Sequence, residues 1–293
     1  MRGPTTIGWR QARPEFPISS SSAGVGDFGS TFRLILLTND SALAAAADSC
    51  VQRIGVDFEH LGKAERQAGY DTRLSRHDWS DLAAIARVLE RAKPFARLNP
   101  VHDGTEIEIE TALSCGAQVL MLPFFRGREE VERFVALVRG RAEVMCLVET
   151  ASSFVRMREI LAVRGVDELM IGLNDLRLQL GVANHFEVLA SPVMDGVCAV
   201  MRKDGRPFSV GGVARAGDAG MPIPSELVYA QYPRLGASGG LLTRAFVQDL
   251  LLADLSDAVA TLRQRLSAWA LEDEAALEAA RTELERRAIA WRK

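Results

Sequence analysis

The chain alternates short apolar runs with longer stretches in which apolar residues recur every three or four positions. The short runs are typical of strands buried on both faces, and the longer stretches are typical of helices. The expected strands cover residues 34–38, 54–58, 94–98, 118–122, 144–148, 168–173, 208–210 and, more weakly, 238–242. The expected helices cover residues 41–52, 79–92, 106–115, 129–139, 152–164, 186–202 and 224–235.

This alternation of strand and helix indicates a parallel sheet whose strands are joined by helical crossovers. Eight such units fit a (β/α)8 TIM barrel, an α/β fold, which we assign to residues 31–248. A doubly wound open sheet is the alternative. It is disfavoured because neither GxGxxG nor GxxxxGK[ST] follows the first strands.

The two ends of the chain differ from the barrel region. Residues 1–30 are rich in Gly, Pro and Ser and are expected to be irregular. Residues 249–293 are expected to form extra C-terminal helices. One apolar stripe in the last of these consists of Leu277, Ala280, Leu284, Ala288 and Trp291. We expect this stripe to pack on another subunit of a homo-oligomer; the alternative is that it packs back on its own barrel.

Composition narrows the class of protein. Hydrophobic residues make up 48% of the chain and charged residues 25%, which is ordinary for a globular protein. The net charge of −3 gives no electrostatic reason to expect nucleic acid. No apolar run approaches the length of a membrane span, and no signal-peptide core is visible, so we expect a cytoplasmic protein. The four scattered cysteines have no zinc-site spacing.

Polar residues follow most of the expected strands. In a (β/α)8 barrel the carboxyl ends of the strands meet at one mouth, where the chemistry takes place. The residues at these ends are Asn39-Asp40, Glu59-His60, Arg97 to Asn99, Pro123-Phe124-Phe125, Glu149-Thr150, Asn174-Asp175, Gly211-Gly212 and Thr243-Arg244. A single acid at the end of one strand is explained equally well as the cap of the following helix. Several acids at one mouth repel each other unless a positive charge lies between them.

Glu149 and Asp175 end neighbouring strands, so their carboxylates can approach a common point. Two hard oxygen ligands without a His or Cys cluster suit Mg²⁺ or Mn²⁺ better than zinc. The other cations expected near the mouth are Arg97 and Arg244. For Arg244, a structural salt bridge is an equally good interpretation.

Five segments carry a resemblance to a known family. They are "VDFEH", "FARLNP", "CGAQVLMLPFF", "CLVETASSF" and "GVDELMIGLNDLRLQLG". In this order they resemble the HpcH/HpaI hydroxyketoacid aldolase/citrate lyase β-subunit family, and "IGxxDLxxxLG" is the most specific part. The resemblance implies a TIM barrel of the phosphoenolpyruvate/pyruvate type. It also implies a divalent metal held by Glu149 and Asp175, and an enolate of pyruvate or of an acyl-CoA.

The resemblance implies roles for further residues. It places Arg97 on the ketoacid or enolate oxygen and assigns Glu59 and His60 to the catalytic strand end, where the His assists proton transfer in the aldolase branch. Imidazole titrates near neutral pH, so His60 is also a candidate acid/base on physical grounds. A surface histidine is the alternative for His60.

Four residues form the predicted substrate-binding set: Gly172, Asn174, Pro123 and Arg244. Backbone N–H groups at a helix start near Gly172 are suited to hold the carboxylate of a ketoacid. The polar stretch 61–78 carries four cations: Lys63, Arg66, Arg73 and Arg76. They suggest an anionic second substrate, and a solvated loop is an equally good interpretation.

We therefore predict a divalent-metal-dependent aldolase, a carbon–carbon lyase acting on small-molecule 2-ketoacid and aldehyde substrates. A chelated cation withdraws electron density from the ketoacid, so an enolate can form beside it. The alternatives are a CoA-thioester lyase of the citrate/malyl-CoA type and a catalytically silent barrel that serves as an assembly subunit. The combination of Glu149, Asp175 and Arg97 argues against a catalytically silent barrel, because an assembly subunit does not need these three residues.

Overall fold

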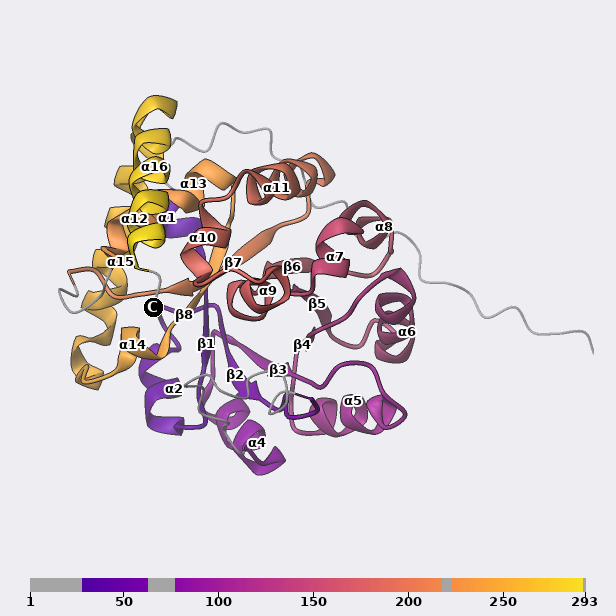
Figure 1. Cartoon of the computed structure of the whole chain (residues 1–293). Coiled ribbons are helices and arrows are strands. Elements are labelled where there is room, and N and C mark those ends of the chain that lie inside the picture. The colour runs from indigo at the N-terminus through magenta and orange to yellow at the C-terminus, as the bar shows by residue number, and fades with distance from the viewer. Residues whose placement is uncertain (1–27, 63–76, 218–222, 292–293) are drawn as a thin grey trace, which may run out of the picture.

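A closed barrel of eight parallel strands forms the centre of the computed structural model, which describes residues 28–62, 77–217 and 223–291 (Figure 1). Neighbouring strands follow each other in sequence order, and β8 pairs with β1 to close the sheet. The strands are β1 (Arg33–Leu37), β2 (Arg53–Asp57), β3 (Lys93–Arg97), β4 (Val119–Leu122), β5 (Glu143–Val148), β6 (Glu168–Ile171), β7 (Phe208–Val213) and β8 (Gly239–Leu242). The predicted (β/α)8 barrel is confirmed.

Helices surround the barrel (Figure 1). They are α1 (Phe28–Thr31), α2 (Ser41–Ala47), α4 (Trp79–Val88), α5 (Thr105–Ser114), α6 (Arg128–Val138), α7 (Ala151–Val155), α8 (Met157–Leu161), α9 (Leu173–Leu180), α10 (His185–Leu189), α11 (Pro192–Asp204), α12 (Ser225–Tyr229), α13 (Gln231–Leu235), α14 (Arg244–Val247), α15 (Leu255–Leu271) and α16 (Glu274–Ala290). A short 3-10 turn, η2 (Leu252–Asp254), precedes α15.

Three predicted helices are each divided in two. The stretch 152–164 forms α7 and α8, 186–202 forms α10 and α11, and 224–235 forms α12 and α13. At the second break Ser191 caps a new helix by accepting the N–H of Met194 at 3.3 Å, with Pro192 in the first helical position. Apolar periodicity continues across such a break, so it does not reveal it.

Side chains alternate between the inside of the barrel and the helical layer. The inner cluster consists of Ile35, Phe95, Val119, Met121, Met145, Leu147 and Met170. The opposite faces of the strands pack beneath the helices, as expected for strands buried on both sides. Side chains at every second position of a strand point to the barrel axis. This alternation determines which of the residues at the strand ends reach the mouth.

Ion pairs close the amino-terminal end of the barrel. Glu168 is 1% exposed and accepts hydrogen bonds from Arg53 and, at 2.7 Å, from Ser209. Arg53 also donates to Glu143 at 2.9 Å, and Arg33 lies 3.7 Å from Glu168. Each buried charge therefore has an opposite charge beside it at the end of the barrel where stability, not catalysis, is expected.

The predicted irregular segment 1–30 lies mostly outside the described residues, and its last three residues belong to helix α1. This helix packs against α15: the N–H of Gly29 donates to Ser267 Oγ at 3.0 Å, and Arg263 donates to the Gly29 carbonyl at 2.6 Å. Helix α15 also contacts α2 and α13. It therefore fills the position of the eighth barrel helix, although the sequence placed it in the tail.

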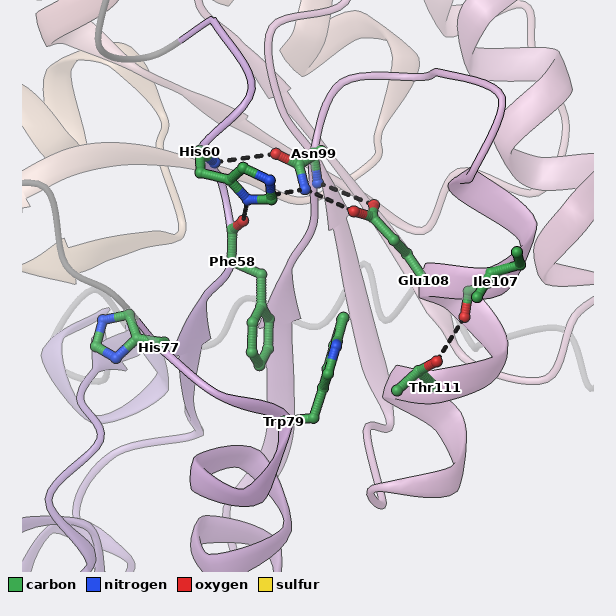
Figure 2. A pocket seen from close by; sticks show the side chains of 8 residues that line it. All are labelled: Phe58, His60, His77, Trp79, Asn99, Ile107, Glu108 and Thr111. Atoms are coloured by element: carbon green, nitrogen blue, oxygen red, sulfur yellow. Dashed lines mark hydrogen bonds between the residues drawn. The ribbon is translucent and has the colours of Figure 1, made fainter.

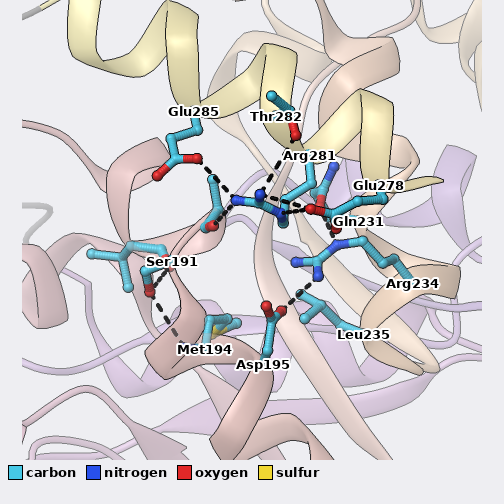
Figure 3. A network of polar contacts seen from close by, with 12 residues as sticks. Ser191, Met194, Asp195, Gln231, Arg234, Leu235, Glu278, Arg281, Thr282 and Glu285 are labelled. Carbon is cyan, nitrogen blue, oxygen red and sulfur yellow. Dashed lines mark hydrogen bonds and ion pairs between the residues drawn. The ribbon is translucent and has the colours of Figure 1, made fainter. Parts of the chain in front are cut away.

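The apolar stripe of the last helix lies against its own chain. Leu284 and Ala288 on α16 are fully buried, and Asn184 donates to the Ala288 carbonyl at 2.9 Å. Arg281 donates to the Ala190 carbonyl at 3.0 Å (Figure 3). The alternative of packing on its own barrel therefore holds for the stripe, and assembly into a homo-oligomer stays a prediction that the stripe no longer supports. Among the described residues, no helix combines the length and apolar character needed to cross a membrane.

Candidate active site

A fixed guanidinium stands at the carboxyl-terminal mouth of the barrel. Arg97 ends β3 beside Asp57, which ends β2 in register with it. Arg97 donates to both carboxylate oxygens of Asp57, from Nε at 2.7 Å and from a terminal nitrogen at 2.5 Å. Its Nε also lies 3.7 Å from Glu59 Oε2. Burial alone would lower the pKa of Arg97, but Asp57, Glu59 and Glu149 raise it above its usual value, so the positive charge is permanent.

Glu149 directly follows β5 and is 2% exposed. Its carboxylate accepts the backbone N–H of Phe124 at 2.9 Å. Burial, Glu59 and Asp175 raise the pKa of Glu149 well above its usual value, and Arg97 and the Phe124 N–H only partly offset them. The site therefore brings together carboxylates that repel each other, and a bound cation would relieve this repulsion.

The Phe124 backbone is strained. Its φ angle is 47°, in the left-handed region that bulky residues rarely adopt. Such strain costs of order 1–3 kcal/mol and persists where the surrounding structure requires it, often at functional sites. Here the strained residue is the one whose N–H binds Glu149.

Asp175 lies in the first turn of α9, and not at the end of a strand as predicted. Strand β6 stops at Ile171, and Gly172 is the cap residue before the helix. Asp175 is 6% exposed, and a helix N-terminus favours a negative side chain. Asn174, its neighbour, is exposed.

Gly172 allows close packing against Glu149. A Cβ atom at this position would lie 2.7 Å from Glu149 Oε2, 2.9 Å from Glu149 Cβ and 3.2 Å from Leu147 Cδ1. Any side chain at residue 172 would therefore displace the Glu149 carboxylate. The glycine predicted to bind substrate has a second use, because it lets the start of α9 approach this acid.

The donor set fits a hard divalent cation. Glu149 and Asp175 are buried carboxylates close enough to raise the pKa of Glu149. Within the described ranges, no group of three or more His, Cys, Asp or Glu side chains could hold a metal by itself. Two carboxylates with further positions left to water and substrate suit Mg²⁺ or Mn²⁺, and a closed protein cage is not required.

The structure separates Glu59 from His60. Glu59 is buried and faces Arg97, whereas His60 is exposed and lines a pocket of about 200 Å³ beside the mouth (Figure 2). The His60 Nδ1 atom lies 2.9 Å from the Phe58 carbonyl oxygen, and its backbone N–H donates to Asn99 at 2.9 Å. Of the two predicted catalytic residues at this strand end, Glu59 joins the charged cluster and His60 borders it.

The remaining predicted residues occupy different positions. Pro123 is buried immediately before Phe124. Arg244 is exposed at the first position of α14, just after β8. The four cations of the polar stretch, Lys63 to Arg76, lie outside the described residues.

Two contributors to the site were missed from the sequence. Asp57 stands inside an apolar run, and its two-residue spacing from Glu59 was the signal that both acids face the barrel axis. Phe124 contributes a backbone N–H that donates to Glu149 from an unusual backbone conformation. A pattern of side-chain types cannot predict such a contact.

Comparison with known proteins gives a family match over most of the barrel. A sequence model of the HpcH/HpaI aldolase/citrate lyase family matches residues 40–204. A pyruvate aldolase of Rhizobium etli is 26% identical over 243 residues, covering 70% of this chain and 89% of its own.

Solved structures share the fold. An HpcH/HpaI aldolase/citrate lyase family protein from Burkholderia cenocepacia superposes with a TM-score of 0.56 at 19% identity, covering 83% of this chain and 96% of its own. A citrate lyase from Burkholderia xenovorans gives a TM-score of 0.55 at 16% identity, covering 88% and 92%. At these identities the likeness extends to the fold alone.

Proposed function

The chain belongs to the HpcH/HpaI aldolase/citrate lyase family, and from this premise we propose that it is a divalent-metal-dependent aldolase. It would make or break a carbon–carbon bond between a 2-ketoacid of the pyruvate type and an aldehyde. One observation carries the proposal: Glu149 lies buried among Glu59 and Asp175, beside a guanidinium that Asp57 holds with two hydrogen bonds. The similarity to a pyruvate aldolase supports pyruvate as the ketoacid.

Glu149 and Asp175 would hold Mg²⁺ or Mn²⁺. When bound, this cation supplies the Lewis acidity that stabilises an enolate of the ketoacid. Arg97 places a permanent positive charge where the enolate oxygen develops, and its bonds to Asp57 keep the guanidinium oriented before substrate arrives. The backbone N–H groups in the first turn of α9, from Leu173 onward, would hold the ketoacid carboxylate, since the Gly172 N–H already donates to the Val148 carbonyl at 2.9 Å.

His60 is suited to proton transfer at the aldehyde side. Its Nδ1 lies 2.9 Å from the Phe58 carbonyl oxygen and 3.4 Å from Asn99 Nδ2; in the tautomer that donates to Phe58, Nε2 is the nitrogen that can accept a proton. Pro123, Asn174 and Arg244 remain proposed substrate contacts at the mouth. A cytoplasmic location is proposed on the sequence alone.

Deuterium exchange into pyruvate tests the proposal without knowledge of the aldehyde. The wild-type protein with Mg²⁺ or Mn²⁺ should exchange the methyl protons of pyruvate in heavy water, and a chelator should stop the exchange. Proton NMR follows the loss of the methyl signal. Binding of the metal without exchange of pyruvate or a close 2-ketoacid would favour the CoA-thioester lyase, and failure to bind a divalent metal would contradict the proposal.

Asp175→Asn separates charge from shape. The amide keeps the size of the carboxylate and loses its charge, so Mn²⁺ affinity should fall at least about tenfold while the barrel stays folded. Titration calorimetry with Mn²⁺ measures the affinity, and circular dichroism checks the fold. Unchanged affinity in a folded variant would remove Asp175 from the metal site.

Gly172→Ala tests the close packing of α9 against Glu149. The added methyl group would displace the Glu149 carboxylate, so Mn²⁺ affinity should fall by about 10- to 100-fold, as it does when groups that orient metal ligands are lost. Gly196→Ala is the matched control, because nothing lies within 4 Å of a Cβ atom there. Equal affinity in both variants would show that Glu149 does not depend on Gly172.

A further inference from the structure

A pocket of about 200 Å³ lies between the ends of β2 and β3 and helices α4 and α5 (Figure 2). We call it the α4–α5 pocket, and it is lined by Phe58, His60, His77, Trp79, Asn99, Ile107, Glu108 and Thr111. The proposed reaction at the metal site uses one residue of this lining, His60. The nature of the other walls indicates what the pocket can bind.

Three of the eight lining residues of the α4–α5 pocket are apolar, and two of these, Phe58 and Trp79, are aromatic. Phe58 and Trp79 stack with ring centroids 4.0 Å apart and an interplanar angle of 24°. Ile107 on α5 also lines the pocket and is 72% exposed, although it is a large apolar residue. A cavity of roughly 150 Å³ with apolar walls is known to accept a benzene ring. The pocket therefore has the size and the surface for a single ring.

A buried amide organises the rim. Asn99 is 0% exposed, and its Oδ1 atom accepts the backbone N–H groups of His60 and Leu61, each at 2.9 Å. Its Nδ2 atom donates to Glu108 Oε1 at 2.6 Å. If the amide were flipped, its NH2 group would face the N–H groups of His60 and Leu61, and its oxygen would face the Glu108 carboxylate. The observed orientation avoids both clashes. Asn99 thereby links the loop after β2 to α5 and holds the two sides of the pocket together.

A histidine side chain lies beside Glu108. His102 Nδ1 accepts the N–H of Gly104 at 3.0 Å, so His102 carries its proton on Nε2. That atom lies 3.2 Å from Glu108 Oε2. Asn99 thus orients the carboxylate of Glu108 before any ligand binds, with His102 beside it.

The polar atoms on the rim favour an uncharged ligand. The His60 tautomer makes Nε2 a hydrogen-bond acceptor, and Glu108 brings a carboxylate. None of the described lining residues is Lys or Arg. Glu108 would repel an anion, whereas a neutral apolar group with a hydroxyl hydrogen at its edge would meet a hydrogen-bond acceptor here.

The α4–α5 pocket begins where the charged cluster ends. Along β2 and the loop that follows, Asp57 and Glu59 contact Arg97, while Phe58 and His60 line the pocket. Successive side chains of an extended segment point to opposite faces, so the pocket and the charged cluster adjoin on the two sides of one short segment at the barrel rim. We propose that the pocket binds the uncharged, ring-sized side chain of the aldehyde, while its carbonyl group lies at the mouth. The inference rests on the proposed aldolase function and names its second substrate class.

Ile107→Trp should fill the pocket without disturbing the fold, because residue 107 is 72% exposed. The wild-type protein should condense pyruvate with benzaldehyde at a kcat/KM at least tenfold above that for acetaldehyde. The variant should lose about tenfold on benzaldehyde and less than twofold on acetaldehyde. Val193→Trp is the matched control, since Val193 is a 57% exposed apolar residue on another helix, and it should change neither value.

The outcomes separate the inference from the proposed function. Pyruvate deuteration needs no aldehyde, so Ile107→Trp should exchange at the wild-type rate. A wild type without preference for benzaldehyde, or an equal loss on both aldehydes in Ile107→Trp, would overturn the pocket assignment while exchange persists. Absence of exchange in the wild type would instead contradict the aldolase function. In that case the unreactive probe benzyl alcohol tests the pocket by itself. It should shift the indole signal of Trp79 in the NMR spectrum of the wild type but not in that of Ile107→Trp. The absence of a shift in the wild type would overturn the inference.

Discussion

Glu149→Gln is expected to abolish the metal-dependent exchange of pyruvate protons, with a loss of at least about 10³-fold. The Lewis acidity of a bound cation contributes several kcal/mol to an enolate-forming step, and each 1.36 kcal/mol corresponds to a tenfold change in rate. The glutamine keeps an oxygen that can accept the Phe124 N–H, so the loop conformation should survive. Proton NMR in heavy water, at saturating Mn²⁺ and pyruvate, measures the loss.

The same variant should be more stable than the wild type when no metal is present. The pKa of Glu149 is raised above its ordinary value of 4.5 by burial, Glu59 and Asp175. The folded protein therefore keeps the Glu149 proton at a pH where the unfolded chain has lost it. This contribution to stability is complete below pH 4.5 or so and is lost as the pH rises through the raised pKa.

Urea unfolding in chelator between pH 5 and 8 measures this effect. The free energy of unfolding of the wild type should fall as the pH rises across this range, and that of Glu149→Gln should fall less. If Glu149→Gln keeps its activity, Glu149 is not a metal ligand. If the variant is less stable than the wild type at pH 8, the carboxylates of the site do not repel each other as proposed.

Arg97→Met is expected to destabilise the metal-free protein by about 3–5 kcal/mol, the cost of removing one partner from a buried ion pair. The side chains of Arg97 and Asp57 are 15% and 12% exposed. Methionine fills part of the volume but removes the two hydrogen bonds that Arg97 gives to Asp57 and the positive charge that lies 3.7 Å from Glu59. Urea unfolding at pH 7 gives the free energy directly.

The double variant Arg97→Met with Asp57→Leu provides the control. Replacing both partners by apolar groups removes the unpaired charge, so the double variant should recover a large part of the lost stability. It should remain inactive in pyruvate exchange, because the fixed positive charge is gone. A loss below about 1 kcal/mol for Arg97→Met would mean that the pair behaves like one at the solvated surface.

Local pattern was sufficient for the architecture. Continuous apolar runs such as 144–148, separated by periodic helical stretches, predict parallel strands with crossovers because both faces of such strands must be buried. Eight of them make a barrel, and the structure has eight strands in sequence order. The helix breaks were not predicted, since caps such as Ser191 act within an uninterrupted apolar periodicity.

The charged residues of the candidate site could also be named in advance. Parallel strands bring their carboxyl ends to one edge, so Glu59, Arg97 and Glu149 could be grouped from their positions alone. Asp175, which was grouped with them, lies near enough to raise the pKa of Glu149, although it is on a helix turn and not on a strand. Proximity at the mouth was therefore predictable to within one or two residues of each strand end.

Only the tertiary structure decided which way each of these residues faces and what holds it. Side chains alternate along a strand, so a shift of one residue sends Glu59 to Arg97 and His60 into the α4–α5 pocket. The pairing of Asp57 with Arg97 depends on the register between β2 and β3, which links residues 40 positions apart. The burial of Leu284 against the chain's own helices likewise depends on the surface that those helices leave uncovered, and no single segment of sequence contains that information.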